Sequence, residues 1–187
     1  LLRGLASNQY RDGQLALLAQ SAEVMAKDAF QLATGAGKLA TLKANDIDKY
    51  EWVSVLDDRT STKCRALDSR VFTVGKGPLP PLHPRCRSTV APVLPDRLRD
   101  ELADVGTRNT QEGPVDSGTS YYTWLKQQDT DYIESVLGPS RTALLIKGDL
   151  TADRFAALQL NRNFEPLTLD EMRKIEPLAF KKAGLVN

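Results

Sequence analysis

The middle of the chain brings together two cysteines and its only histidine, three residues that could bind a metal ion. Cys64 falls in a short predicted helix, and His83 and Cys86 frame a tight His-Pro-Arg-Cys turn. Thiolate and imidazole are ligands that zinc prefers, but a closed tetrahedral site needs four ligands. Asp57, Asp58 or a water could supply the fourth. One interpretation of the pattern is therefore a zinc site formed by Cys64, His83 and Cys86.

Two other interpretations of these residues stay open at this point. Cys64 and Cys86 could form a disulfide if the protein works in an extracellular particle. They could also be buried free thiols next to a hydrogen-bonded His83. The residues alone do not choose between a metal site, a disulfide and free thiols.

Catalytic interpretations find less support. The short signatures of catalytic cysteines are not matched, so a Cys–His nucleophilic pair is disfavoured. Asp57, Asp58 and Arg59 fit a turn with an ion pair at a strand end better than a catalytic carboxylate pair. The sequence contains no P-loop, dinucleotide fingerprint, HExxH or GxSxG motif. We therefore expect no catalytic residues and a protein that is not an enzyme.

The elements that would position these side chains form a small β-rich knot over residues 50–94. Aromatic and β-branched residues predict three strands, over residues 50–56, 70–74 and 85–93. Thr60 or Ser61 can cap a short helix that runs to Leu67, because their hydroxyls accept free amide protons. An antiparallel sheet of this size is not stable alone, and a bound metal would supply the missing stabilisation.

Residues 14–32 show the periodicity of an amphipathic helix. Apolar residues recur on one stripe and the charged residues lie off it: Leu15, Leu18, Ala22, Met25, Ala29 and Leu32. We expect this stripe to pack in the core; the alternative is a surface that contacts a partner helix. Glycines within residues 34–37 either end the helix or mark close contact with a neighbour. A second helical piece is expected to end near residues 45–46.

The chain after the knot reads as a linker followed by short helices. Residues 96–104 form a charged amphipathic segment. Residues 106–120 are rich in Gly, Thr, Asn, Ser and Pro without apolar periodicity, which predicts a linker or an exposed arm. Capping and stop signals then predict helices over residues 121–127, 131–137, 140–146, 151–160, 168–175 and 177–184.

These elements predict an α+β fold with three parts. Residues 1–105 hold N-terminal amphipathic helices and the small antiparallel knot around the Cys/His motif, whose core is residues 50–94. Residues 106–120 form the linker or exposed arm. Residues 121–187 form a C-terminal set of short helices.

Net charge and composition limit the partners and the cellular location that the sequence supports. The formal net charge of the 187 residues is +1, so any DNA-binding surface would have to be a local patch. Basic residues do gather in the centre, although a solvated face explains them better: Lys63, Arg65, Arg70, Arg85, Arg87, Arg97 and Arg99. No apolar run approaches the roughly 20 residues of a membrane span. Two cysteines without signs of secretion favour synthesis in the cytoplasm.

Several motifs together resemble one known family. They are Tyr50-Glu-Trp-Val, Leu56-Asp-Asp-Arg-Thr-Ser, Cys64-Arg-Ala-Leu-Asp and Pro81-Leu-His-Pro-Arg-Cys-Arg. The combination is similar to the phage Mu protein F-like minor head proteins of tailed phages and prophages. Later segments resemble the downstream part of longer members, so the likeness extends from about Tyr50 to Leu185. Many relatives carry Cys-x-x-Cys at the first half of the motif, but here Ser61 replaces the first of those cysteines.

The resemblance implies a structural role in the virion. Members are minor capsid proteins that take part in head morphogenesis and procapsid assembly. They associate with the portal vertex, and some are linked to packaged DNA. Expected partners are therefore the portal protein, the major capsid protein and DNA, in an assembly that holds several copies. An alternative is a toxin-like or effector enzyme domain carried on a phage head protein.

Overall fold

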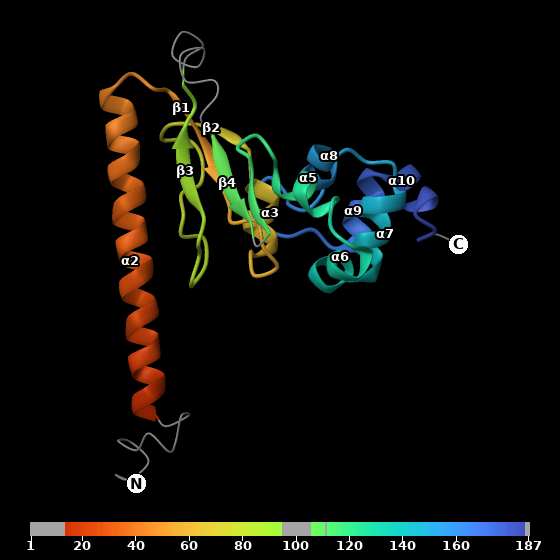
Figure 1. Ribbon diagram of the computed structural model, residues 1–187, viewed down its shortest axis with the longest axis horizontal. Helices are drawn as coiled ribbons and strands as arrows, with labels where there is room; N and C mark the ends of the chain where they lie inside the picture. Colours follow the sequence, from red (N-terminus) through yellow and green to blue (C-terminus); the bar gives the residue numbers. More distant parts are fainter. Residues whose placement is uncertain (1–13, 95–105, 111, 186–187) are drawn as a thin grey trace.

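In the computed structural model, an α+β body projects from one side of a single long helix (Figure 1). The structure describes residues 14–94, 106–110 and 112–185. The predicted fold class is thereby confirmed: helix first, then small antiparallel sheets around the Cys/His cluster, then short helices. The charged segment predicted over residues 96–104 lies outside the described residues.

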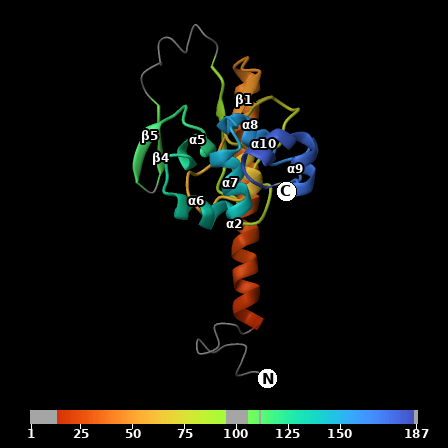
Figure 2. The same ribbon diagram turned by 90° about the vertical axis from the view of Figure 1, so that its right-hand side faces the viewer.

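The long helix α2 (Gln14–Ala44) runs without interruption through its glycines. Gly35 is buried, and a Cβ added there would lie 3.4 Å from the carbonyl oxygen of Pro80. The second expectation for these glycines, close contact with a neighbour, therefore fits Gly35. At 1.5 Å per residue the helix is about 46 Å long. Its N-terminal half extends past the body, as the orthogonal view shows (Figure 2).

The prediction that the apolar stripe of α2 packs in the core is wrong. Leu18, Met25 and Leu32 are exposed, and the body packs instead on a neighbouring face that contains Gly35 and Leu42. Polar groups make much of that contact. Gln31 donates to the Ser88 carbonyl at 2.6 Å, Lys38 donates to the Thr89 hydroxyl at 2.6 Å, and the Arg85 amide donates to Asp28 at 3.2 Å.

The central sheet has three antiparallel strands in the order β2-β1-β3. They are β1 (Lys49–Val53), β2 (Val71–Thr73) and β3 (Thr89–Pro92). Trp52 in the middle strand faces Val90, and Tyr50 faces Phe72. Because side chains alternate along a strand, this register buries Tyr50 and Trp52 fully. The three predicted strands are confirmed and each is shorter than predicted, although β1 begins one residue earlier. The short helix α3 (Thr62–Leu67) follows β1.

Residues predicted as a linker or exposed arm form a hairpin of β4 (Thr107–Thr110) and β5 (Gly113–Asp116). A buried ion pair attaches it to the body: Arg108 donates to both carboxylate oxygens of Asp68, at 2.8 and 3.1 Å. The same carboxylate accepts from the amides of Ser54 and Tyr121, each at 2.7 Å. Asp68 therefore joins the sheet, the hairpin and the C-terminal helices. The division of the chain into domains at residues 106–120 stays a prediction.

Six short helices form the rest of the body, as the capping signals predicted. They are α5 (Tyr121–Leu125), α6 (Thr130–Leu137), α7 (Pro139–Lys147), α8 (Ala152–Ala157), α9 (Leu169–Ile175) and α10 (Pro177–Lys182). Ser120, Thr151 and Thr168 cap three of them, and Thr168 shares a capping box with Glu171. Aromatic rings pack edge to face in their core, including Tyr122 against Phe155. None of the helices in the described ranges combines the length and apolar character that crossing a membrane requires.

Candidate metal centre

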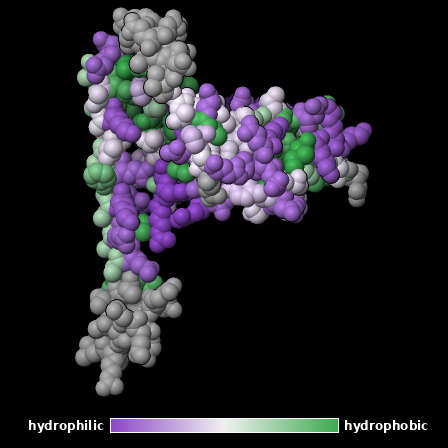
Figure 3. All heavy atoms as spheres, viewed as in Figure 1, coloured by the Kyte–Doolittle hydropathy of each residue, from purple (hydrophilic) through white to green (hydrophobic). Residues whose placement is uncertain are grey.

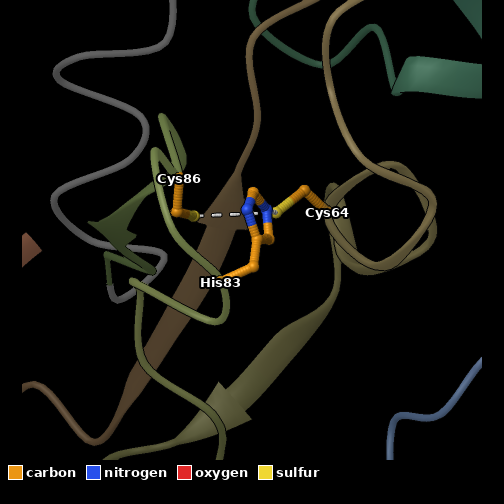
Figure 4. Close-up of side chains that lie close together, drawn as sticks. All are labelled: Cys64, His83 and Cys86. Atoms are coloured by element: carbon orange, nitrogen blue, oxygen red, sulfur yellow. Dashed lines mark hydrogen bonds between the residues drawn. The ribbon is translucent and has the colours of Figure 1, made fainter. Parts of the chain in front are cut away.

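The predicted ligands meet at one point between α3 and the loop that leads into β3. Cys64 extends from the first turn of α3, while His83 and Cys86 extend from the loop, so that the three side chains face one another (Figure 4). Arg85, between the two loop ligands, adopts a positive φ of 59°, and the Cys86 amide donates to the His83 carbonyl at 3.2 Å. This tight turn brings imidazole and thiol to the same side.

Two of the separations between ligand atoms are close to those around a tetrahedral ion. The Cys64 and Cys86 Sγ atoms are 3.7 Å apart, and Cys64 Sγ lies 3.3 Å from His83 Nε2. Two thiolates bound to zinc at about 2.3 Å would be separated by about 3.7 Å. All three ligand atoms lie within 4.8 Å of one another. Cys64, His83 and Cys86 are therefore close enough to bind a metal.

Both cysteines are free thiols in this structure. Their sulfur separation of 3.7 Å is a nonbonded contact, since a disulfide bond is about 2.05 Å long. Trp52, Ala66, Leu67 and Leu160 pack around them as one apolar cluster.

A hydrogen bond sets the tautomer of His83. Its Nδ1 lies 2.9 Å from the Pro84 carbonyl oxygen, which can only accept, so Nδ1 carries the proton. The lone pair of Nε2 therefore faces the two thiols. A backbone carbonyl that orients a histidine in this way is the usual outer partner of a metal-bound imidazole.

Ser61 lies beside the cluster. Its Oγ is 2.8 Å from His83 Nε2 and accepts from the Cys64 amide at 3.4 Å as the N-cap of α3. The serine thus closes the cluster with hydrogen bonds. Sequence reasoning identified Ser61 as the replaced cysteine and as a possible cap, but did not anticipate its contact with His83.

The aspartates suggested as a fourth ligand are not part of this group. Asp57 instead accepts two hydrogen bonds from Arg87, at 2.6 and 2.7 Å, and one from the Thr60 hydroxyl at 3.0 Å. Burial alone would raise the pKa of Asp57, but these hydrogen bonds and the charge of Arg87 outweigh it and hold the pKa below its usual value. The pair supports the turn before α3. The strand-end interpretation predicted a turn with an ion pair here, but the cation is Arg87 and not Arg59.

The two thiols have opposite acidities. The hydrogen bond from Cys64, reinforced by backbone hydrogen bonds, lowers the pKa of Cys86 against the effect of burial. The hydrogen bond to Cys86 and burial raise the pKa of Cys64. Cys86 is therefore the more acidic of the two thiols. A thiolate is the form that binds metal, so a low pKa favours metal binding. Both cysteines are buried, which restricts the approach of a substrate to their sulfur atoms.

The central basic residues that the structure describes are divided between the interior and the surface. Arg65 is buried and donates to the carbonyls of Asp58 and Val136, and Arg70 donates to the Ala156 carbonyl. Arg85 and Arg87 line an open pocket of about 670 Å³ between α2 and the His83 loop. Arg97 and Arg99 lie outside the described residues. Arg65 and Arg70 thus connect the central region to the C-terminal helices and their loops, and only some of the described basic residues face solvent.

Comparison with known families supports the resemblance seen in the sequence. Residues 6–91, a little under half of the chain, match the family described as Phage Mu protein F like protein. The matched stretch contains α2, the central sheet up to Ala91, and all three candidate ligands. Searches of curated proteins and of solved structures gave no match.

The match implies a phage head morphogenesis protein. The family is one of structural head proteins, which favours a role other than catalysis. It also implies residence in the virion and contact with other head components.

Proposed function

We propose that this protein is a structural minor capsid protein of a tailed phage or prophage, which takes part in procapsid assembly and associates with the portal vertex. The observation that carries the proposal is the family match over residues 6–91, which includes the complete Cys/His cluster. Two features of the architecture support it. The buried cluster serves packing better than turnover, and α2 offers a long exposed surface for assembly.

The proposal is tested in the phage or prophage that encodes the chain. Mass spectrometry of purified procapsids should detect the protein, and a stop codon in its gene should lower the yield of infectious particles by at least tenfold. Supplying the intact gene in trans is the control and should restore the yield. A protein absent from all particles, together with an unchanged yield, would contradict the proposed role.

Portal association has its own test. Tagged protein should retain the portal protein of the same phage when the two are expressed together, and should retain much less of the major capsid protein expressed in its place. The reverse preference would move the contact from the portal to the shell. If DNA contacts contribute, retention of DNA should fall steeply with salt, because phosphate contacts release counterions.

We further propose that Cys64, His83 and Cys86 hold one zinc ion, with a water or Ser61 completing the coordination. The support is the donor set, the short separations of Cys64 Sγ from Cys86 Sγ and from His83 Nε2, and the orientation of His83 Nε2 toward the thiols. Zinc would connect α3 to the β3 loop and stabilise the small sheet.

Metal content and a count of free thiols test the zinc site together. One zinc per chain, with two thiols that titrate after chelation and denaturation, is the expected result. Cys86→Ser should remove the zinc, whereas Ser61→Cys should tighten zinc binding by at least about tenfold, because thiolate is a better zinc ligand than hydroxyl. Two free thiols without zinc, also in protein produced with added zinc, would leave only a hydrogen-bonded cluster.

A further inference from the structure

The helix α2 carries a continuous apolar face that no other part of the described chain covers. Leu18, Met25 and Leu32 are 65, 70 and 54% exposed along it. Seven alanines share this half of the helix and are also exposed: Ala19, Ala22, Ala26, Ala29, Ala33, Ala36 and Ala40. Figure 3 shows it as pale green atoms on the side of α2 that faces away from the body.

The body leaves this face free. At 100° per residue, the buried Gly35 and Leu42 point well over 100° away from the centre of the apolar face. The charged residues before the last turn lie outside the apolar half as well. Glu23 and Lys27 pair with each other at 2.5 Å, and Asp28 accepts from the Arg85 amide. A partner can therefore approach without burying these charges.

The apolar face repeats every seven residues. Leu18, Met25 and Leu32 form one exposed row, and an alanine follows each of them. Leu39, also followed by an alanine, continues the row where α2 meets the body and is half-buried there. A seven-residue repeat sustained over about three heptads is the pattern of helices that pack side by side in a coiled coil. Each large side chain thus has a small one beside it on the same helix.

We propose that α2 pairs with α2 of a second copy of this chain, in antiparallel orientation and centred on Ala29. Turning one copy end for end about this residue places large residues opposite small ones. Leu18 then lies opposite Ala40, Met25 opposite Ala33, and Leu32 opposite Ala26. The face is therefore complementary to itself, which is the requirement for a two-fold interface.

The parallel alternative fits less well. Met25 would then face Met25 and Ala29 would face Ala29, so that wide and narrow layers would alternate along the same pair of helices. Narrow layers would leave gaps that cost packing energy.

The area also suffices for two copies. A strip about 46 Å long that covers about a third of a helix roughly 12 Å across amounts to about 600 Å². Two such strips bury about 1,200 Å², the lower end of the range for specific interfaces. The midpoint Ala29 is also the midpoint of α2, so this register overlaps the helices over their full length.

The mass of the full-length protein in solution tests the pairing. Light scattering during size exclusion should give twice the 20.6 kDa chain mass at micromolar concentration. Met25→Glu should give a single chain mass and weaken pairing at least about 100-fold, because each dimer would bury two carboxylates. The control Gln20→Glu adds a charge to the opposite face of α2 and should leave the dimer intact. Equal helicity by circular dichroism should confirm that both variants fold.

Cross-linking tests the orientation. A mixture of Met25→Cys protein with Ala33→Cys protein should form an oxidised pair, whereas Met25→Cys alone should not. Wild-type protein under the same oxidant controls for Cys64 and Cys86. A single chain mass for the wild type at all concentrations would overturn the proposal, as would a mass above two chains or ready cross-linking of Met25→Cys alone.

Discussion

The long helix and the short helices of this protein are held in place in opposite ways. α2 has 31 residues, yet among its described side-chain positions only Gly35 and Leu42 are buried. The six C-terminal helices have five to nine residues each, too few to be stable in isolation, and every one contributes to a single buried core. The short helices depend on tertiary packing, whereas the length of α2 makes its helix less dependent on the body.

This contrast shows that helical periodicity reports an apolar face without saying which molecule covers it. In the C-terminal helices the apolar residues meet one another within the chain. In α2 only Leu39 and Leu42, near its C-terminal end, meet apolar residues of the body. Leu18, Met25 and Leu32 stay exposed, because the body packs on another face, partly through Gln31 and Lys38. Matched substitutions in α2 and in the body test whether the two regions differ in this way.

The largest effect is expected from two phenylalanines. Phe155→Ala should lower the free energy of unfolding by about 3–5 kcal/mol, because Phe155 is fully buried against Tyr122. Phe30→Ala should change it by less than about 0.5 kcal/mol, because Phe30 is 76% exposed on α2. Urea denaturation of both variants and the wild type at one protein concentration measures the difference. Similar losses for both would mean that Phe30 is buried in solution.

A smaller effect is expected at the junction between the sheet and the C-terminal helices. Asp68→Ala should cost about 3 kcal/mol, because it leaves Arg108 without its buried counterion and two amides without acceptors. The matched control Asp170→Ala removes an exposed pair with Arg173 and should cost less than about 1 kcal/mol. Thermal unfolding of both variants provides the measurement. Equal costs would show that the junction contributes no more than the surface.

The smallest effect concerns pH. The pKa of Asp57 is lowered on folding, so its contribution to stability is complete above the unfolded pKa of about 3.9 and is lost as pH falls through the folded pKa. The difference in unfolding free energy between wild type and Asp57→Asn should be about 1 kcal/mol at neutral pH, because Arg87 is partly exposed, and should shrink below about pH 4.

Glu23→Gln on α2 is the matched control for this pH dependence. The hydrogen bond and charge of Lys27 lower the pKa of Glu23 too, but this carboxylate is fully exposed, so its variant should follow the wild-type curve. A Glu23→Gln curve that departs from wild type as strongly as that of Asp57→Asn would remove the distinction between the two regions.

The sequence predicted the elements well wherever local chemistry decides them. Caps at Ser61, Thr151 and Thr168, and the alternation around Trp52, identify helices and strands because the hydrogen bonds or faces involved lie within a few residues. The burial of α2 and the hairpin over residues 107–116 could not be predicted in this way. Both depend on contacts between distant residues, such as Arg108 with Asp68.

In the candidate site, too, features that depend on nearby residues were predicted, whereas those that depend on distant contacts were not. Residue types and the tight turn were enough to group His83 with Cys86, and the short helix added Cys64. The turn and ion pair at Asp57 were predicted, but the partner was not, since Arg87 lies 30 residues away. Nor was the position of Ser61, whose contact with His83 requires the β3 loop to fold back onto α3.

The contacts of the Asp68 carboxylate show that the end of the family match is not a structural boundary of this chain. The stretch that matches the family ends at Ala91, but Arg108 and the Tyr121 amide, which satisfy Asp68, come after that point. A fragment cut where the match ends would keep the acid inside and lose its counterion. The segment that matches the family is thus shorter than the segment needed to satisfy every buried hydrogen bond and ion pair of Asp68.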